Sequence, residues 1–192
     1  MPRTPEENKK IKLERKKSIL KASLRLFALY GVENVAMDSI ADRVGCSHGL
    51  LYHYYANKTE ILMDLQSESK NLFQGNFRSL IESENDPYKF LQKFNHLFIS
   101  SINESEEKQY YLFLFLNEVV KNRRTIGKDK YFKAVNQKII DGQNKGLFKT
   151  DNSLSLIFIY ISTLLGYTYY LIKTKEKHES LDENVFLNVF MK

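Results

Sequence analysis

The side chains with the clearest chemical purpose are the basic ones near the N-terminus. Residues 1–25 hold nine lysines and arginines against three glutamates, an excess of six positive charges that equals the formal net charge of the whole 192-residue chain. Clusters of lysine and arginine bind phosphate groups, so this segment favours contact with a nucleic acid or an anionic surface. From the charge pattern alone, a solvated tail explains the same residues equally well.

Patterns for catalysis or metal binding are missing from the sequence. The four histidines lack the spacing of metal ligands, and there is neither a glycine-rich phosphate loop nor a nucleophile elbow. The single cysteine, Cys46, excludes an internal disulfide and argues against a cysteine-based zinc site. We therefore expect a protein that is not an enzyme and that needs no metal or cofactor.

Two short helices joined by a tight turn follow the basic segment. Apolar residues at helical spacing predict helices over about 38–44 and 47–54. Ala41 is small where the two helices would cross, Gly45 lies where the chain must reverse, and Leu51 returns to the core. This spacing is typical of a helix-turn-helix, although chance matches are common in helical proteins.

Longer helices follow, and the fold class is predicted to be all-α. Three prolines and eight glycines in the chain are few for a turn-rich β fold. Asp86-Pro87 marks a helix start, because proline suits the first helical turn. We place a domain boundary near residue 60 and the last two helices at about 153–174 and 182–191.

Residues 152–172 form an uncharged stretch that approaches the length of a membrane span. The stretch contains four tyrosines, three serines and two threonines, which favours a helix buried in a soluble protein. The N-terminus lacks the apolar segment of a signal peptide, so we expect a cytoplasmic protein. A membrane-associated protein, anchored by residues 152–172 with its basic segment on anionic lipid, is the alternative.

Two stretches match a known pattern in order and spacing: KSILKASLRLFALYG at residues 17–31 and IADRVGCSHGLLYHYYANKTEIL at residues 40–62. They resemble the N-terminal DNA-binding domain of the TetR (tetracycline-repressor) family of bacterial regulators. The rest of the chain is similar to that family only in length and helical class. The resemblance implies a basic N-terminal arm at 1–14, a helix-turn-helix domain at 15–60, and a ligand-binding and dimerisation domain at 61–192.

The resemblance also implies which residues touch DNA, because the helix from Ser47 to Tyr54 would lie in the major groove. Gly49 would let that helix approach closely, and the apolar Leu50 suggests contact with a thymine methyl group. In this setting the basic segment is better explained by phosphate contact than by a solvated tail. The predicted DNA contacts are Arg15, Lys16, Lys17, Ser47, His48, Gly49, Leu50, Tyr52, His53 and Lys58.

In this family the second domain binds a small inducer, and polar residues within aromatic stretches are candidates for that task. A Glu118 buried in the pocket would favour a cationic ligand. Ser162 and Gly166 would allow close helix approach in a homodimer formed by the helices at about 153–174 and 182–191. The predicted ligand contacts are Phe94, His96, Phe113, Asn117, Glu118, Tyr167 and Tyr170.

The sequence therefore predicts a dimeric transcriptional repressor that binds a palindromic operator on double-stranded DNA. A small-molecule inducer would release it by changing the separation of the two DNA-binding heads, through the helix that begins at Lys58. A DNA-binding protein with a closed core and no inducer is a further alternative.

Overall fold

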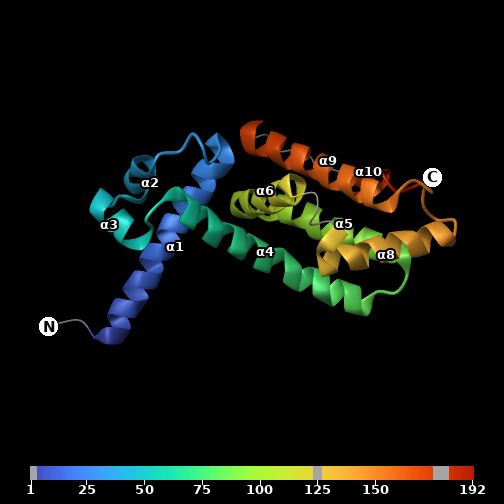
Figure 1. Cartoon of the computed structure of the whole chain (residues 1–192), viewed down its shortest axis with the longest axis horizontal. Helices are drawn as coiled ribbons and strands as arrows, with labels where there is room; N and C mark the ends of the chain where they lie inside the picture. Colours follow the sequence, from blue (N-terminus) through green and yellow to red (C-terminus); the bar gives the residue numbers. More distant parts are fainter. Residues whose placement is uncertain (1–3, 123–126, 175–181) are drawn as a thin grey trace. The chain divides into compact units, whose positions relative to one another are not determined.

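The computed structural model describes residues 4–122, 127–174 and 182–192. Contacts divide the chain into two compact units, Met1–Ser67 and Glu68–Lys192. The all-α prediction is confirmed (Figure 1), since the described residues add only an isolated bridge between Phe148 and Met191. The helices are α1 (Pro5–Tyr30), α2 (Met37–Val44), α3 (His48–Tyr54), α4 (Lys58–Ser83), α5 (Pro87–Glu104), α6 (Glu106–Lys121), α8 (Lys130–Asn144), α9 (Ser153–Thr174) and α10 (Asn184–Leu187).

Helix α1 begins much earlier than the first buried residue of the domain. Thr4 and Glu7 form a capping box, in which each side chain accepts a hydrogen bond from the other residue's backbone N–H. Residues 5–14, which we assigned to a basic arm, are therefore the first ten residues of a helix. Burial starts only at Ile19, so the preceding part of α1 is a solvated helical extension.

The turn between α2 and α3 has the geometry that the sequence predicts. Gly45 adopts a left-handed conformation with φ of 70°, which glycine reaches without strain. Its N–H donates to the carbonyl of Asp42 at 3.1 Å, and the Cys46 N–H donates to that of Ala41 at 3.0 Å. These two bonds form a Schellman motif, which ends α2 and turns the chain so that α3 can begin. Leu51 is fully buried, as expected, whereas Cys46 is only half-buried.

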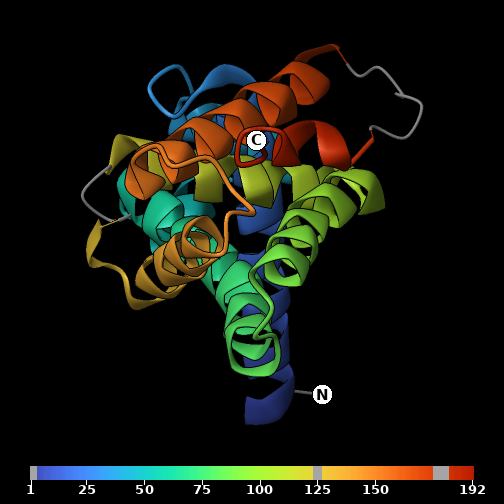
Figure 2. The ribbon, with the colours of Figure 1, turned by 90° about the vertical axis from the view of Figure 1, so that its right-hand side faces the viewer.

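The second unit packs its helices around an aromatic core. Phe73 and Phe77 of α4 contact Phe98 of α5, with ring centroids 6.3 and 5.4 Å from it. Helix α9 lies against α6, α8 and α10 (Figure 2), and eight of its residues are buried. By length and composition α9 could span a membrane. Eight buried residues of 22 place one side of α9 in the protein core, which supports the interpretation of a core helix, although less of its circumference is buried than the sequence suggests.

The last predicted helix, at about 182–191, is shorter in the structure. Helix α10 covers only Asn184–Leu187, and the chain after it turns to meet the loop that follows α8. The Lys149 N–H donates to the carbonyl of Phe190 at 2.8 Å, and Met191 bridges Phe148. The N–H groups of residues 188–191 still donate to carbonyls three or four residues earlier, so this segment is a series of turns, and the Phe190 carbonyl binds the distant loop.

Gly142 in α8 offers a test of this packing. A Cβ at this position would lie 2.1 Å from a ring carbon of Phe148, which is fully buried and cannot move aside into solvent. We expect Gly142→Ala to lower the free energy of unfolding by about 1–3 kcal/mol, the usual cost of overpacking a core. Denaturant unfolding monitored by circular dichroism measures the change.

The matched control is Gly75→Ala in α4, where nothing lies within 4 Å of the added methyl group. This variant should be stabilised by up to about 1 kcal/mol, because alanine favours helix over glycine. Equal stability of the two variants would contradict the packing of Phe148 on α8.

Candidate functional site

Helix α3 is held in place by one cap and one core residue. The Ser47 Oγ accepts a hydrogen bond from the Leu50 N–H at 3.3 Å, which makes Ser47 the N-cap of α3. On the inner side, Leu51 is fully buried. With the cap and this residue fixed, the opposite face of the short helix points into solvent.

That exposed face carries four of the predicted DNA contacts. These residues lie on one side of α3 because their spacing matches the helical repeat, and each is exposed. They are His48, Gly49, Tyr52 and His53. Half of the Tyr52 surface is accessible, so its ring and hydroxyl are open to a partner. A Cβ added at Gly49 would meet nothing within 4 Å, so this position opens outward. Leu50 lies beside them and is half-buried.

His48 also joins α3 to α2. Its Nδ1 lies 3.1 Å from the Asp38 carboxylate, and both side chains are exposed. An exposed pair of this kind contributes little to stability. The carboxylate of Asp38 nevertheless orients the His48 imidazole at the start of α3. Local sequence spacing does not predict this contact between α2 and α3.

Lys16, predicted to bind DNA, is engaged within its own domain. Its Nζ lies 2.8 Å from the Asp64 carboxylate, which also accepts a hydrogen bond from the Tyr55 hydroxyl at 2.9 Å. The bond from Lys16 is the main cause that lowers the pKa of Asp64 below its usual value, followed by the bond from Tyr55. This network stabilises the domain at neutral pH, and that contribution is lost as the pH falls through the lowered pKa.

Lys58 also has a structural task. Its ammonium group donates to the carbonyl oxygens of Glu33 and Val35 at 2.9 and 3.3 Å, which ties the start of α4 to the loop before α2. Two of its three N–H groups are used in this way, which leaves one for another acceptor. The helix start itself is capped, because the Asn57 side chain accepts from the Glu60 N–H at 3.1 Å.

The exposed cations of the first unit lie mainly on the solvated part of α1. Four lysines there are exposed and form no ion pair with the residues that the structure describes, and Arg15 nearby is half-exposed. Fourteen helical residues precede Ile19, so this extension is about 21 Å long. The four lysines are Lys9, Lys10, Lys12 and Lys17.

The predicted ligand contacts occupy three different environments. One is buried in the aromatic core, four are half-buried on α6 and α9, and two are exposed. Across the described ranges, no group of three or more His, Cys, Asp or Glu residues is placed to hold a metal ion. The buried ligand-contact candidate is Phe94. The half-buried ones are Phe113, Asn117, Glu118 and Tyr167, and the exposed ones are His96 and Tyr170.

His96 lies at the surface of α5 rather than inside the bundle. Phe94 and Phe98, two residues to either side, point into the core, so helical geometry turns His96 outward. Its Nδ1 lies 2.9 Å from the Glu183 carboxylate. Glu118 is half-buried and accepts a hydrogen bond from Asn122, so the buried carboxylate that would favour a cationic ligand is not found.

A buried polar chain next to His96 was not predicted. The Tyr160 hydroxyl donates to the Asn95 side-chain oxygen at 2.9 Å, and the Asn95 amide donates to the Glu183 carbonyl at 2.7 Å. Burial raises the pKa of Tyr160 well above its usual value, so the hydroxyl keeps its proton. The chain attaches the segment before α10 to α5 and α9.

One face of α9 is exposed along its length and is nearly free of charge. Ile159 and Tyr170 are 51% and 44% exposed, and Thr163 and Gly166 lie on the same face. A Cβ at Gly166 would meet nothing within 4 Å. We call Ile159, Ser162, Thr163, Gly166 and Tyr170 the α9 strip. Small residues between large apolar ones let two helices approach closely.

Comparisons with known proteins agree with this arrangement. Residues 19–65 match the family described as bacterial regulatory proteins, tetR family. The transcriptional repressor KstR2 of Mycobacterium tuberculosis is 22% identical over 158 residues, which cover 77% of this chain and 76% of that protein. The transcriptional activator FasR of Mycolicibacterium smegmatis is 32% identical over 108 residues, 56% of this chain and 48% of its own. The crystal structure of AibR with isovaleryl coenzyme A and operator DNA has a TM-score of 0.66 at 20% identity, covering 91% of this chain and 94% of that one.

Proposed function

The chain belongs to the TetR family of bacterial transcriptional regulators, and from this premise we propose that it is a dimeric repressor that an inducer releases from a palindromic operator. The observation that carries the proposal is the outward face of α3. His48, Gly49, Tyr52 and His53 present imidazole, hydroxyl and open backbone on a helix narrow enough for the major groove. The cytoplasm, where DNA is accessible, is the proposed location.

The α9 strip supports a homodimer as the DNA-binding form. An exposed face of Ile159, Thr163, Gly166 and Tyr170 buries apolar surface when it meets a second copy of itself. A twofold dimer presents two copies of α3, which matches a palindrome with half-sites about one helical turn apart. Burial of the other side of α9 supports this arrangement over a membrane anchor. With α10 reduced to one turn, α9 is the main proposed dimer element.

Helix α4 supplies the proposed route from inducer to DNA. It is one helix from Lys58 to Ser83, and it contributes residues to both units. In the second unit, the Ser69 hydroxyl donates to the Tyr111 carbonyl at 2.7 Å, and the Tyr111 hydroxyl donates to Glu68 at 2.6 Å. A ligand that shifts α6 would therefore pull on α4. Among the seven predicted ligand contacts, the proposal favours the four half-buried ones on α6 and α9, which are Phe113, Asn117, Glu118 and Tyr167.

Selection of binding sites from random duplex DNA tests the proposed function. We expect the purified protein to enrich a palindromic motif, because each subunit would read the same half-site. Absence of any enriched motif, with the protein folded by circular dichroism, would contradict it. An enriched motif without symmetry would contradict the dimer.

The salt dependence of DNA binding tests the helical extension of α1. Replacing Lys9, Lys10, Lys12 and Lys17 with glutamine should flatten the slope of log affinity against log salt by about 0.9 for each phosphate that is no longer neutralised. Fluorescence anisotropy with the selected duplex at several salt concentrations measures the slope. Lys16 is left in place, because its contact with Asp64 supports the fold.

The matched control removes the same amount of charge from the second unit. Lys89, Lys121, Lys133 and Lys145 are exposed lysines there, and their replacement with glutamine should leave the slope unchanged. An equal effect of both variants would mean that total charge, not the position of the extension, sets DNA affinity.

A further inference from the structure

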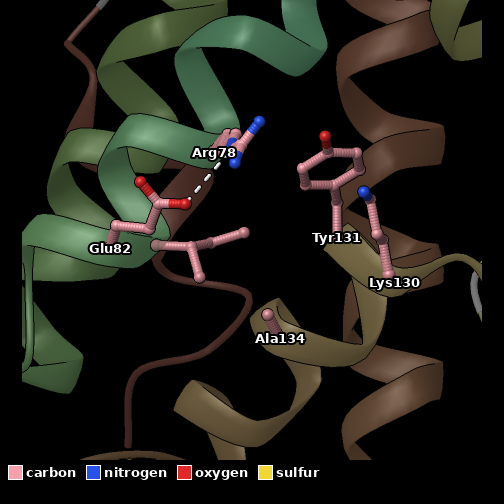
Figure 3. Close-up of a pocket in the computed structure, with 6 residues that line it drawn as sticks. Arg78, Glu82, Lys130, Tyr131 and Ala134 are labelled. Atoms are coloured by element: carbon pink, nitrogen blue, oxygen red, sulfur yellow. Dashed lines mark hydrogen bonds and ion pairs between the residues drawn. The ribbon is translucent and has the colours of Figure 1, made fainter.

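A cleft of about 240 Å³ opens between the C-terminal half of α4 and the start of α8 (Figure 3). None of the residues predicted from sequence to bind a ligand lies in its wall. Two facing helices build it, three residues coming from each. Its lining residues are Arg78, Ile81 and Glu82 of α4, and Lys130, Tyr131 and Ala134 of α8.

The polar groups of the cleft favour an anion. Arg78 uses its Nε–H for the Glu82 carboxylate, 3.0 Å away, so its two terminal nitrogens with four N–H donors remain for a ligand. Across the cleft, the Lys130 ammonium lies 5.0 Å from the centre of the Tyr131 ring. The Tyr131 hydroxyl stands between these two cations (Figure 3). Two cations against one carboxylate leave the lining with one net positive charge.

The remaining wall is apolar. Ile81 and Ala134 are both half-buried and face each other from the two helices. A guanidinium group pairs best with a planar carboxylate or phosphate, whereas an aliphatic wall favours a hydrocarbon chain. The volume is about eight times the space that one water molecule occupies in the liquid, which suits a molecule of roughly eight non-hydrogen atoms.

We propose that this cleft binds a small organic acid. Its carboxylate lies at the Tyr131 hydroxyl, with Arg78 on one side and Lys130 on the other, and its aliphatic chain covers Ile81 and Ala134. Glu82 acts as a positioning residue, because its bond to Nε holds the guanidinium toward the cleft. As far as regulation is concerned, the inference rests on the proposed function, with the acid as a second effector that acts on α4 from this cleft, separate from an inducer held by α6 and α9.

Hexanoate, with eight non-hydrogen atoms, is the probe. Titration of the full-length, isotope-labelled protein by amide NMR should give saturable shifts at Ile81, Tyr131 and Ala134. Hexylamine, of similar length and opposite charge, should give none, and inorganic phosphate should bind more weakly because it leaves the apolar wall uncovered. Equal binding of hexylamine or of inorganic phosphate would overturn the assignment of an organic acid.

Variants test the two cations. Arg78→Gln and Lys130→Gln should each weaken hexanoate binding about tenfold or more, because each removes a charge-assisted contact. Lys133→Gln is the matched control, an exposed lysine on the same helix that does not line the cleft. Equal weakening by all three variants would overturn the proposal. Circular dichroism verifies that each variant is folded.

Measurements with DNA separate this inference from the proposed function. If no DNA motif is selected, the proposed repressor function is contradicted. Binding of hexanoate to the cleft is still tested by NMR in that case. If a motif is selected, saturating hexanoate should lower DNA affinity in the wild type and not in Arg78→Gln. Unchanged DNA affinity of hexanoate-bound wild type would overturn the regulatory part of the inference.

Discussion

Replacing Gly49 with leucine is expected to weaken binding to the selected operator by about a hundredfold, the upper range for disrupting the reading of one base pair. The substituted side chain has open space around it, since nothing lies within 4 Å of the added Cβ. The fold should therefore tolerate it, and the helix should gain up to about 1 kcal/mol because leucine favours helix over glycine. The cost arises only when α3 enters DNA, where the bulky side chain holds the backbone away from the base edges.

Gly75→Leu in α4 is the matched control for this variant. It makes the same chemical change at another exposed helical glycine with nothing within 4 Å of the added Cβ. Fluorescence anisotropy should give wild-type affinity for Gly75→Leu and a large decrease for Gly49→Leu. A Gly49→Leu protein that keeps its DNA affinity would mean that this face of α3 does not meet the groove.

Gly166→Arg is expected to separate the proposed dimer into monomers at micromolar concentration and to remove most of the operator affinity. Two copies of the α9 strip would bring the new charges together in an interface that buries Ile159 and Tyr170. Unpaired buried charges cost several kcal/mol, which exceeds what a small interface supplies. A monomer presents a single α3, so its affinity should fall toward the nonspecific level, about a thousandfold below the dimer.

Sedimentation velocity measures the state of association directly. Gly75→Arg introduces the same side chain at an exposed position outside the α9 strip and should stay dimeric. The monomeric variant should keep the helical content of the wild type, because the Gly166 position is open in the folded chain. A Gly166→Arg protein that sediments as a dimer would place the interface elsewhere.

Local features of this fold could be predicted because neighbouring residues determine them. The Ser47 cap, the Gly45 turn and the Asp86 cap each depend on groups within a few positions of one another. The outward turn of His96 was equally available from sequence, since Phe94 and Phe98 set the inner face of that helix. The aromatic neighbours of His96 suggest a pocket, whereas helical phase places its side chain at the surface; its role as a ligand contact stays a prediction.

Contacts between distant parts of the chain could not be predicted. Lys16 belongs to the basic segment, and the family resemblance implies a DNA contact at Lys58. Asp64 and two loop carbonyls engage these two lysines in the folded domain. Such pairs depend on how α1 and α4 pack, which no local spacing reveals. The segment after α10 likewise depends on a distant contact, because the Phe190 carbonyl accepts a hydrogen bond from the Lys149 N–H of the loop after α8.

The claim that two copies of α3 read the major groove is tested most directly by dimethyl sulfate protection of the selected duplex. This reagent methylates guanine N7 in the major groove and adenine N3 in the minor groove, so it distinguishes the two grooves. We predict protected guanines in two clusters, with centres about one helical turn or a whole multiple apart. A single cluster, or protection confined to adenine N3, would contradict major-groove reading by a dimer.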